Sequence, residues 1–309
     1  MRGALRMAAV LTMVPISLVG STASGSPSSQ QEGPKIYISA DFEGVTGVVT
    51  GEQLGPDGFE YARFREFMTG EVLAAIEGAR AAGAGEILVS DSHGNGQNLL
   101  IDRFGEDVKI VRSWPRTLTM MEGIDDSFDG AIFIGYHAGT TNPEGVRAHT
   151  MSSATLTDIR INDYSSNETI WNAAVAGNFS VPVIMVSGDD ATATEAKARL
   201  GDIETAVVKW AHSFHSATTL TPKAGQEVIR QAAERAVRRL LDGEMAPYLV
   251  QTPVAITVRF KHYQPSQILA YLPIFERIDA HAVRYNATDM EEAARTLVFL
   301  RNYRADITP

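Results

Sequence analysis

Short apolar segments alternate with amphipathic helical segments from residue 35 onward, and this alternation restricts the possible fold more than any other feature of the sequence. The apolar segments are continuous and β-branched, as in strands that helices cover on both faces. They lie at residues 35–40, 86–90, 108–111, 131–136 and 181–187. Helical spacing of apolar residues is found at residues 61–82, 167–177 and 191–199. This order predicts an α/β fold with a largely parallel sheet flanked by helices.

A smaller α+β region is expected at the C-terminal end of the chain. The pattern predicts an amphipathic helix over residues 222–241, a strand over residues 254–260 and a helix over residues 289–303. We therefore divide the chain into an α/β domain, residues 35–210, and a C-terminal α+β region, residues 211–309.

The first 25 residues have the composition of a secretory signal peptide. Arg2 and Arg6 precede an apolar run at residues 7–20, and small residues suited to cleavage follow it. The run is too short to cross a bilayer comfortably, so we expect no stable membrane anchor. Residues 26–34, rich in Ser, Gln, Gly and Pro, are predicted to form a linker. We expect an exported protein, located in a periplasm or outside the cell.

The charge and the lack of cysteine narrow the range of functions. The chain has 27 basic and 37 acidic side chains and a formal net charge of −10. Because such a surface repels phosphate backbones, nucleic acid is not an expected partner. Without cysteine there is no disulfide, no thiolate metal ligand and no cysteine nucleophile. Any metal must be held by carboxylates, histidines, backbone carbonyls or water.

Acidic and histidine side chains gather where the predicted strands end. They are Asp41 and Glu43 after the first strand, His93 after the second, His137 after a later one and Glu168 at the start of a predicted helix. Taken singly, each is most simply a helix cap or an ordinary loop residue. Together they form a mixed set that suits zinc or manganese, and a shared carboxylate suits two ions bridged by a water. The set indicates a metallohydrolase.

Three further features lie near this set. His149 is a candidate for positioning the nucleophile or stabilising a developing oxyanion. The pair Asp189 and Asp190 is predicted to cap the helix that follows it. Residues 94–96 (GNG) lack the lysine and the glycine spacing of a phosphate-binding loop, so nucleotide binding is not expected.

The motifs around these residues resemble those of the zinc-dependent D-aminopeptidases of the DppA type. They occur in the family's order at residues 39–44 (SADFEG), 89–93 (VSDSH), 135–138 (GYHA), 148–151 (AHTM), 161–163 (IND) with Glu168, 172–173 (NA) and 188–190 (GDD). The resemblance covers residues 35 to about 200, and extends more loosely to the end of the chain.

The resemblance implies a centre with two zinc ions per subunit. Its ligands would be Asp41, Glu43, His93, His137 and Glu168. Asp41 would bridge the ions, and His149 would assist a metal-activated water. The implied activity is the release of N-terminal D-amino acids, such as D-Ala, from short peptides. Members of the family form ring-shaped homo-oligomers, so we expect a ring here too, such as a decamer.

Two other interpretations remain open. Another metallohydrolase, such as a phosphoesterase, would use the same ligands, although no arginine-rich loop lies beside them. A non-enzymatic exported protein that binds peptides or solutes would also fit the signal peptide, but it leaves the histidines and carboxylates without a role. We favour the peptidase, with residues 35–210 as the metal-binding catalytic domain. We expect residues 211–309 to support oligomerisation and the substrate pocket.

Overall fold

Seven strands form the larger of two sheets, sheet A, in the order β3-β2-β1-β4-β7-β8-β9. These are β1 (Ile36–Ala40), β2 (Ile87–Asp91), β3 (Val108–Val111), β4 (Gly130–Ile134), β7 (Val183–Asp189), β8 (Glu204–Ser213) and β9 (Ser216–Thr219). Neighbouring strands are parallel, except for the antiparallel pair of β8 and β9. The predicted α/β fold is confirmed. Because β2 and β4 lie on opposite sides of β1, the strand order reverses there, and such a point is where open α/β sheets bind ligands.

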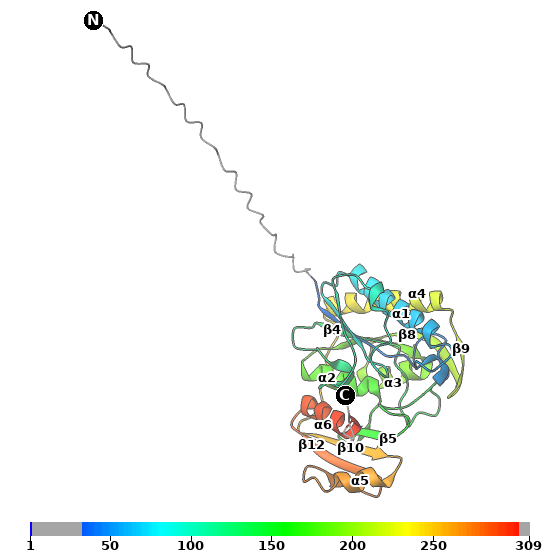
Figure 1. The fold of residues 1–309 in the computed structure, drawn as a ribbon, viewed down its shortest axis with the longest axis vertical. Helices are drawn as coiled ribbons and strands as arrows, with labels where there is room; N and C mark the ends of the chain where they lie inside the picture. Colours follow the sequence, from blue (N-terminus) through cyan, green and yellow to red (C-terminus); the bar gives the residue numbers. More distant parts are fainter. Residues whose placement is uncertain (2–32, 303–309) are drawn as a thin grey trace. The chain divides into compact units, whose positions relative to one another are not determined.

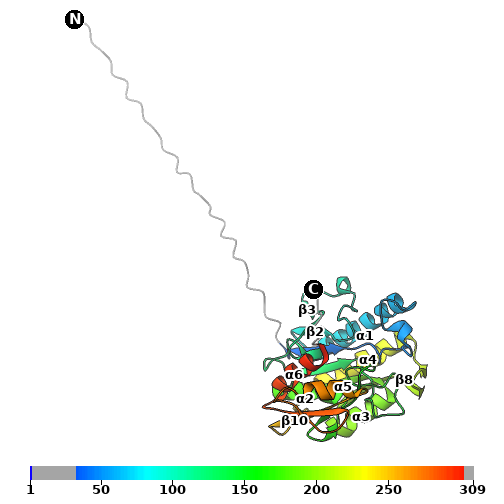
Figure 2. The same cartoon turned by 60° about the horizontal axis from the view of Figure 1, so that its bottom comes forward.

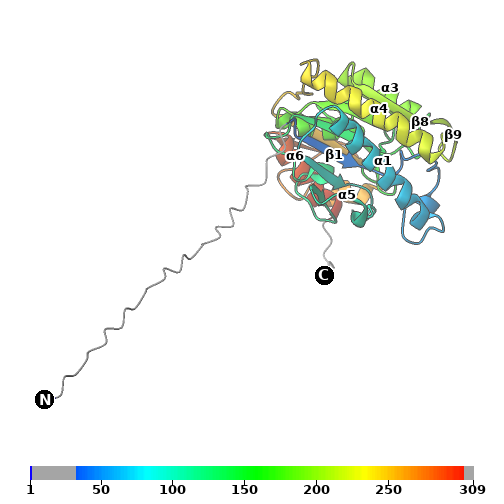
Figure 3. The ribbon, with the colours of Figure 1, turned by 90° about the horizontal axis from the view of Figure 1, so that it is seen from above.

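Helices cover both faces of sheet A (Figure 1). On one face α1 (Tyr61–Ala81) and α4 (Pro222–Leu241) lie side by side, as Figure 3 shows from above. They approach closely because Gly78 has no side chain: a Cβ there would lie 2.1 Å from the carbonyl oxygen of Arg230. The other face carries α2 (Glu168–Asn178) and α3 (Asp190–Leu200).

A second, antiparallel sheet, sheet B, has the order β11-β12-β10-β5-β6. These are β5 (Leu156–Ile161), β6 (Tyr164–Ser165), β10 (Val254–Phe260), β11 (Glu276–Arg277) and β12 (Ala282–Ala287). Figure 2 brings this sheet forward together with α5 (Tyr263–Leu269) and α6 (Met290–Asn302). Apolar side chains of α2, α6 and both sheets share one core. Single turns of 3₁₀ helix occur at Gly51–Gln53, Ile101–Arg103 and Thr119–Met121.

The structure describes Met1 and residues 33–302. Apart from Met1, the predicted signal peptide and the linker as far as residue 32 lie outside the described residues. The boundary predicted between residues 210 and 211 falls inside β8, and residues 222–241 form a helix on sheet A. In addition, β5, from the predicted α/β domain, pairs with β10, from the predicted C-terminal region. The two predicted regions therefore share both sheets.

Three long strands, β5, β8 and β12, were not predicted from the sequence. Each mixes buried and exposed positions, as in the buried–intermediate–exposed sequence of β5. Strands with one solvated face lack the continuous apolar run that identifies a strand buried on both faces. Among the described residues, no helix has the length and apolar character needed to cross a membrane.

Candidate metal centre

The carboxyl ends of three adjacent strands bring the predicted ligands together. Asp41 follows β1, His93 lies two residues beyond β2, and His137 follows β4. Glu43 lies in the loop after β1, where Gly44 lets the chain pass close to β4: a Cβ on Gly44 would lie 1.9 Å from a backbone oxygen. The reversal of strand order at β1 thus gathers side chains that are far apart in the sequence.

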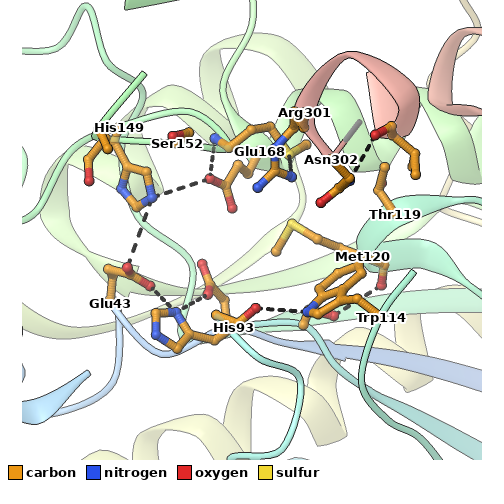
Figure 4. Close-up of a pocket in the computed structure, with 17 residues that line it drawn as sticks. Glu43, His93, Trp114, Thr119, Met120, His149, Ser152, Glu168, Arg301 and Asn302 are labelled. Carbon is orange, nitrogen blue, oxygen red and sulfur yellow. Dashed lines mark hydrogen bonds and ion pairs between the residues drawn. The ribbon is translucent and has the colours of Figure 1, made fainter. Parts of the chain in front are cut away.

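Two other segments complete the cluster. Glu168 is the first residue of α2, whose N-terminus is capped by Asn167. His149 lies in the loop between β4 and β5, and its ring stacks on that of His137 with centroids 4.1 Å apart. The structure brings all six predicted site residues into one cluster, as Figure 4 shows for Glu43, His93, His149 and Glu168. The predicted cap is also present, since the Asp189 carboxylate accepts a hydrogen bond from the Thr192 backbone N–H.

Each of the three histidines uses one ring nitrogen on a backbone carbonyl. His93 Nε2 lies 2.9 Å from the Leu54 oxygen, and the Nδ1 atoms of His137 and His149 lie 3.0 Å and 2.9 Å from carbonyl oxygens. These contacts place the proton on the nitrogen that faces the carbonyl. The second nitrogen then faces the carboxylates with its lone pair, which is the arrangement of histidines that bind metals.

The carboxylate oxygens lie close to these free nitrogens. His93 Nδ1 is 2.8 Å from Glu43 Oε2 and 3.3 Å from Asp41 Oδ1. His137 Nε2 is 3.3 Å from Asp41 Oδ2 and 3.4 Å from Glu168 Oε1. His149 Nε2 is 3.7 Å from Glu168 Oε1 and 3.9 Å from Glu43 Oε1. A lone pair beside a carboxylate is unfavourable unless a cation or a proton lies between them.

Burial makes this requirement stricter. Asp41, Glu43, His137 and Glu168 each have at most 4% of their surface exposed. Oδ2 of Asp41, Oε2 of Glu43 and Nε2 of His137 are buried without a hydrogen-bond partner among the described residues. Buried polar atoms of native proteins normally have partners. The donor set therefore fits metal ions, which would satisfy these atoms together.

The pKa values reflect the crowding of charge. Burial and the neighbouring Glu43 raise the pKa of Asp41. Burial also opposes ionisation of Glu43, but the histidines beside it, His93 first, hold the pKa of Glu43 well below its usual range. For His93, the attraction of Glu43 outweighs the opposing effect of burial and raises the pKa well above the usual value. The cluster thus strongly favours bound positive charge.

Two groups of three side chains are arranged so that one atom from each lies within 4.8 Å of the others. They are Asp41, Glu43 and His137, and His137, His149 and Glu168. The two groups share His137, and each offers three donor atoms to an ion. His149, predicted as the catalytic histidine, lies close enough to the carboxylates to be a ligand candidate by geometry alone.

Known proteins place the chain in a family. A family model described as D-aminopeptidase matches residues 35–299. The chain belongs to the D-aminopeptidase family. A D-aminopeptidase of Bacillus subtilis (strain 168) is 31% identical over 268 residues, which cover 86% of this chain and 96% of that protein. A solved structure, "Zn-dependent D-aminopeptidase DppA from Bacillus subtilis, a self-compartmentalizing protease", matches with a TM-score of 0.82 and 30% identity, covering 86% of this chain and 96% of that one. The resemblance seen in the motifs is confirmed.

The pocket of this D-aminopeptidase family member includes residues that the sequence did not reveal. A cavity of about 300 Å³ opens beside the ligand cluster, and Trp114, Met120, Met151 and Arg301 line it (Figure 4). Trp114 is held by a 2.8 Å hydrogen bond from its indole N–H to the Gly94 carbonyl. Trp114 lies in a loop, Met120 in the 3₁₀ turn Thr119–Met121 and Arg301 at the end of α6, where no motif of the sequence marked them. Met151 closes the AHTM motif, but the sequence assigned it no role.

Lys209 was also missed. It is fully buried in β8, and its Nζ donates hydrogen bonds to the carbonyl oxygens of Glu43, Val45 (3.2 Å) and Val48 (2.7 Å). It thereby holds the loop that carries Glu43. A signal was present, since Lys209 stands in the apolar segment AVVKWA (206–211), where a charged side chain needs buried partners.

Proposed function

We propose that this protein is a zinc-dependent D-aminopeptidase that holds two zinc ions per subunit and releases N-terminal D-amino acids, such as D-Ala, from short peptides. The observation that carries the proposal is the arrangement of three histidines, each with one nitrogen on a backbone carbonyl and the other facing buried carboxylates. The zinc dependence named for the Bacillus subtilis structure is consistent with this donor set.

We propose Asp41 as the bridge between the two ions, because its two carboxylate oxygens face different histidines. Its Oδ1 faces His93 at 3.3 Å and its Oδ2 faces His137 at 3.3 Å. One ion would be held by Asp41, Glu43 and His93, and the other by Asp41, His137 and Glu168. Two zinc ions at these positions would acidify a water and polarise the scissile carbonyl.

His149 is suited to move a proton. Its Nδ1–H is engaged by the Arg147 carbonyl, so Nε2 is the nitrogen with the free lone pair, and it lies on the pocket wall. The backbone N–H of His149 donates to the Ala138 oxygen (3.0 Å), and that of Met151 donates to Glu168 (2.6 Å). These bonds fix the loop on both sides of the ring. A base held in this way can take a proton from the attacking water and return it to the leaving amine.

The test combines zinc analysis with turnover. Purified protein is assayed for D-Ala release from D-Ala-D-Ala, with L-Ala-L-Ala and a chromogenic phosphoester as comparison substrates. We expect D-Ala release, about two zinc ions per subunit, and loss of zinc in Asp41→Ala and His137→Ala. His149→Ala should keep its zinc and lose roughly 10²- to 10⁴-fold in kcat. His262→Ala, at an exposed histidine outside the cluster, is the control. Full activity of metal-free protein, or turnover of the phosphoester alone, would contradict the proposal.

We further propose that the subunits associate, with the expected ring as the form of the assembly. Residues 263–278 expose several large apolar side chains, namely Tyr263, Ile268, Tyr271, Leu272, Ile274 and Ile278. We call these side chains the apolar patch, because exposed apolar groups of this kind typically mark a protein interface. The Bacillus subtilis structure is described as self-compartmentalizing, which supports association. Light scattering on Tyr271→Asp and Ile274→Asp variants tests this, because the charges should dissociate the assembly, and an unchanged mass would exclude the patch.

We also propose export, on the composition of residues 1–25 alone. N-terminal sequencing of the protein recovered from cell fractions tests this. A mature chain that begins near residue 26 in an exported fraction is expected, whereas an intact N-terminus in the cytoplasm would refute it.

A further inference from the structure

Arg301 brings to the pocket a positive charge that has no ion-pair partner among the described residues. It lies in the last turn of α6 and lines the same cavity as Glu168 and His149. Figure 4 shows its side chain pointing from α6 into the pocket, next to Glu168. Although the residue as a whole is exposed at the end of the helix, burial of the guanidinium lowers its pKa, and Glu168 acts in the opposite direction. The charged end of this otherwise exposed residue therefore faces the pocket.

The contacts of Arg301 do not satisfy this charge. Its guanidinium donates from Nη1 to the Met151 sulfur, at 3.7 Å. No carboxylate oxygen of a described residue lies within ion-pair distance of its guanidinium. A guanidinium has five N–H donors in a planar fork, and a thioether is a weak acceptor. A guanidinium that faces a pocket with so few partners among the described residues has donors left for a ligand.

Two other arginines show what a structural arginine looks like in this protein. Arg295, on the same helix, is exposed and pairs with Glu291 at 2.9 Å. Arg116 is buried, and it donates to the carbonyls of Ser113 and Asp91 and to the Ser90 hydroxyl. A cation at a helix C-terminus is favourable in itself. This effect explains neither the burial that lowers the pKa of Arg301 nor the direction of its side chain.

We propose that Arg301 binds the C-terminal carboxylate of a short peptide substrate and thereby makes the enzyme prefer dipeptides with a free carboxylate. The inference rests on the proposed D-aminopeptidase function. Guanidinium and carboxylate match in a bidentate pair, which Lys cannot reproduce. In a dipeptide, a single Cα separates the scissile nitrogen from the carboxylate, so the two groups lie within a few ångströms of each other. Arg301 and the carboxylates of the cluster line one cavity, so a substrate that fills it meets both.

The size and polarity of the cavity agree with such a substrate. Its volume of about 300 Å³ is at the lower end of the range for small-molecule sites. Asp41, Glu43 and Glu168 line the cavity together with the proposed zinc ions, and Arg301 adds a positive group to the lining. A zwitterionic dipeptide would place its reacting amino-terminal residue at the zinc ions and its carboxylate at Arg301.

The experiment compares D-Ala-D-Ala with D-Ala-D-Ala amide, which differ only in the terminal carboxylate. Wild-type enzyme should prefer the free acid. Arg301→Met should lose roughly 10- to 100-fold in kcat/KM on the acid, mainly through KM, and keep its activity on the amide. Arg301→Lys should recover part of the loss, and Arg295→Met, on the exposed face of α6, should behave as wild type. Equal turnover of acid and amide by wild type, or an equal loss on both in Arg301→Met, would overturn the inference.

A binding measurement separates this inference from the proposed function. Calorimetry on zinc-loaded His149→Ala, with and without Arg301→Met, measures the affinity for D-Ala-D-Ala and for its amide without turnover. Weaker binding of the acid alone in the double variant supports the inference, and equal affinities refute it. If wild type releases D-Ala from neither compound, the proposed function fails, and the calorimetric result still decides the role of Arg301.

Discussion

Glu71 is a buried carboxylate outside the metal cluster, and its protonation should control stability near neutral pH. It lies on α1 with 1% of its surface exposed. Its Oε1 accepts a 2.8 Å hydrogen bond from the Thr46 backbone N–H, while Oε2 has no partner among the described residues. Burial raises the pKa of Glu71 from 4.5 to about 7, against the opposing effects of Thr46 and Lys209. We predict that Glu71→Gln changes the pH dependence of unfolding.

The magnitude follows from the difference between the folded and unfolded pKa. From 4.5 to about 7 is about 2.5 pH units, and at about 1.4 kcal/mol per unit this amounts to ~3 kcal/mol. Between these values the folded protein keeps the proton that the unfolded chain has released. The free energy of unfolding of the wild type therefore falls as pH rises from 4.5 to 7, and the loss is complete above pH 7. Glu71→Gln keeps the acceptor for Thr46 and carries no charge, so it should lack this loss.

The assay is urea denaturation of both proteins at several pH values from 5 to 8. The metal centre titrates in both, so the difference between the two free energies isolates Glu71. As pH rises, we expect the free energy of unfolding of the variant to increase relative to that of the wild type. At pH 8 the variant should be more stable by ~3 kcal/mol. Glu66→Gln, at an exposed glutamate of the same helix, is the control and should follow the wild type. Parallel profiles for wild type and Glu71→Gln would refute the reasoning.

Three further outcomes are expected. Lys209→Met removes a donor from three carbonyl oxygens: that of Val45 keeps the Val48 N–H, whereas those of Glu43 and Val48 lose their donor. The variant should therefore lower the free energy of unfolding by ~2–3 kcal/mol and weaken zinc binding in titration calorimetry, while the exposed Lys197→Met should change neither. Gly44→Ala places a Cβ 1.9 Å from the Tyr136 carbonyl oxygen and should lower the free energy of unfolding by about 3 kcal/mol in urea denaturation. Gly51→Ala, with open space around it, should lower it far less. Removal of metal by a chelator should lower the melting temperature, because the buried carboxylates then repel one another. Added zinc should restore the melting temperature, and an unchanged melting curve would count against a metal centre.

The parallel core and the ligand cluster could be predicted from the sequence for one physical reason. Strands covered on both faces are continuous apolar runs, so their ends are easily recognised. In a parallel sheet those ends lie along one edge, and polar residues just beyond them must meet there. Asp41, His93 and His137 satisfy this rule, since β1, β2 and β4 are neighbours. Strand β5 fails it, because it alternates polar and apolar residues and joins the other sheet.

Residues whose role depends on a distant partner could not be found in the same way. Lys209 acts on Glu43, 166 positions away, and nothing in the local pattern of either residue specifies the other. Arg301 lies in the last turn of an amphipathic helix, where an arginine is ordinary, and only the packing of α6 beside α2 brings it to the pocket. Different elements supply the proposed metal ligands and the rest of the pocket lining, and this matters for function. Sheet A and the start of α2 supply the ligands, whereas α6, which packs with sheet B, supplies part of the substrate wall. Changes in α6 can therefore alter which peptide is accepted while the metal ligands stay in place.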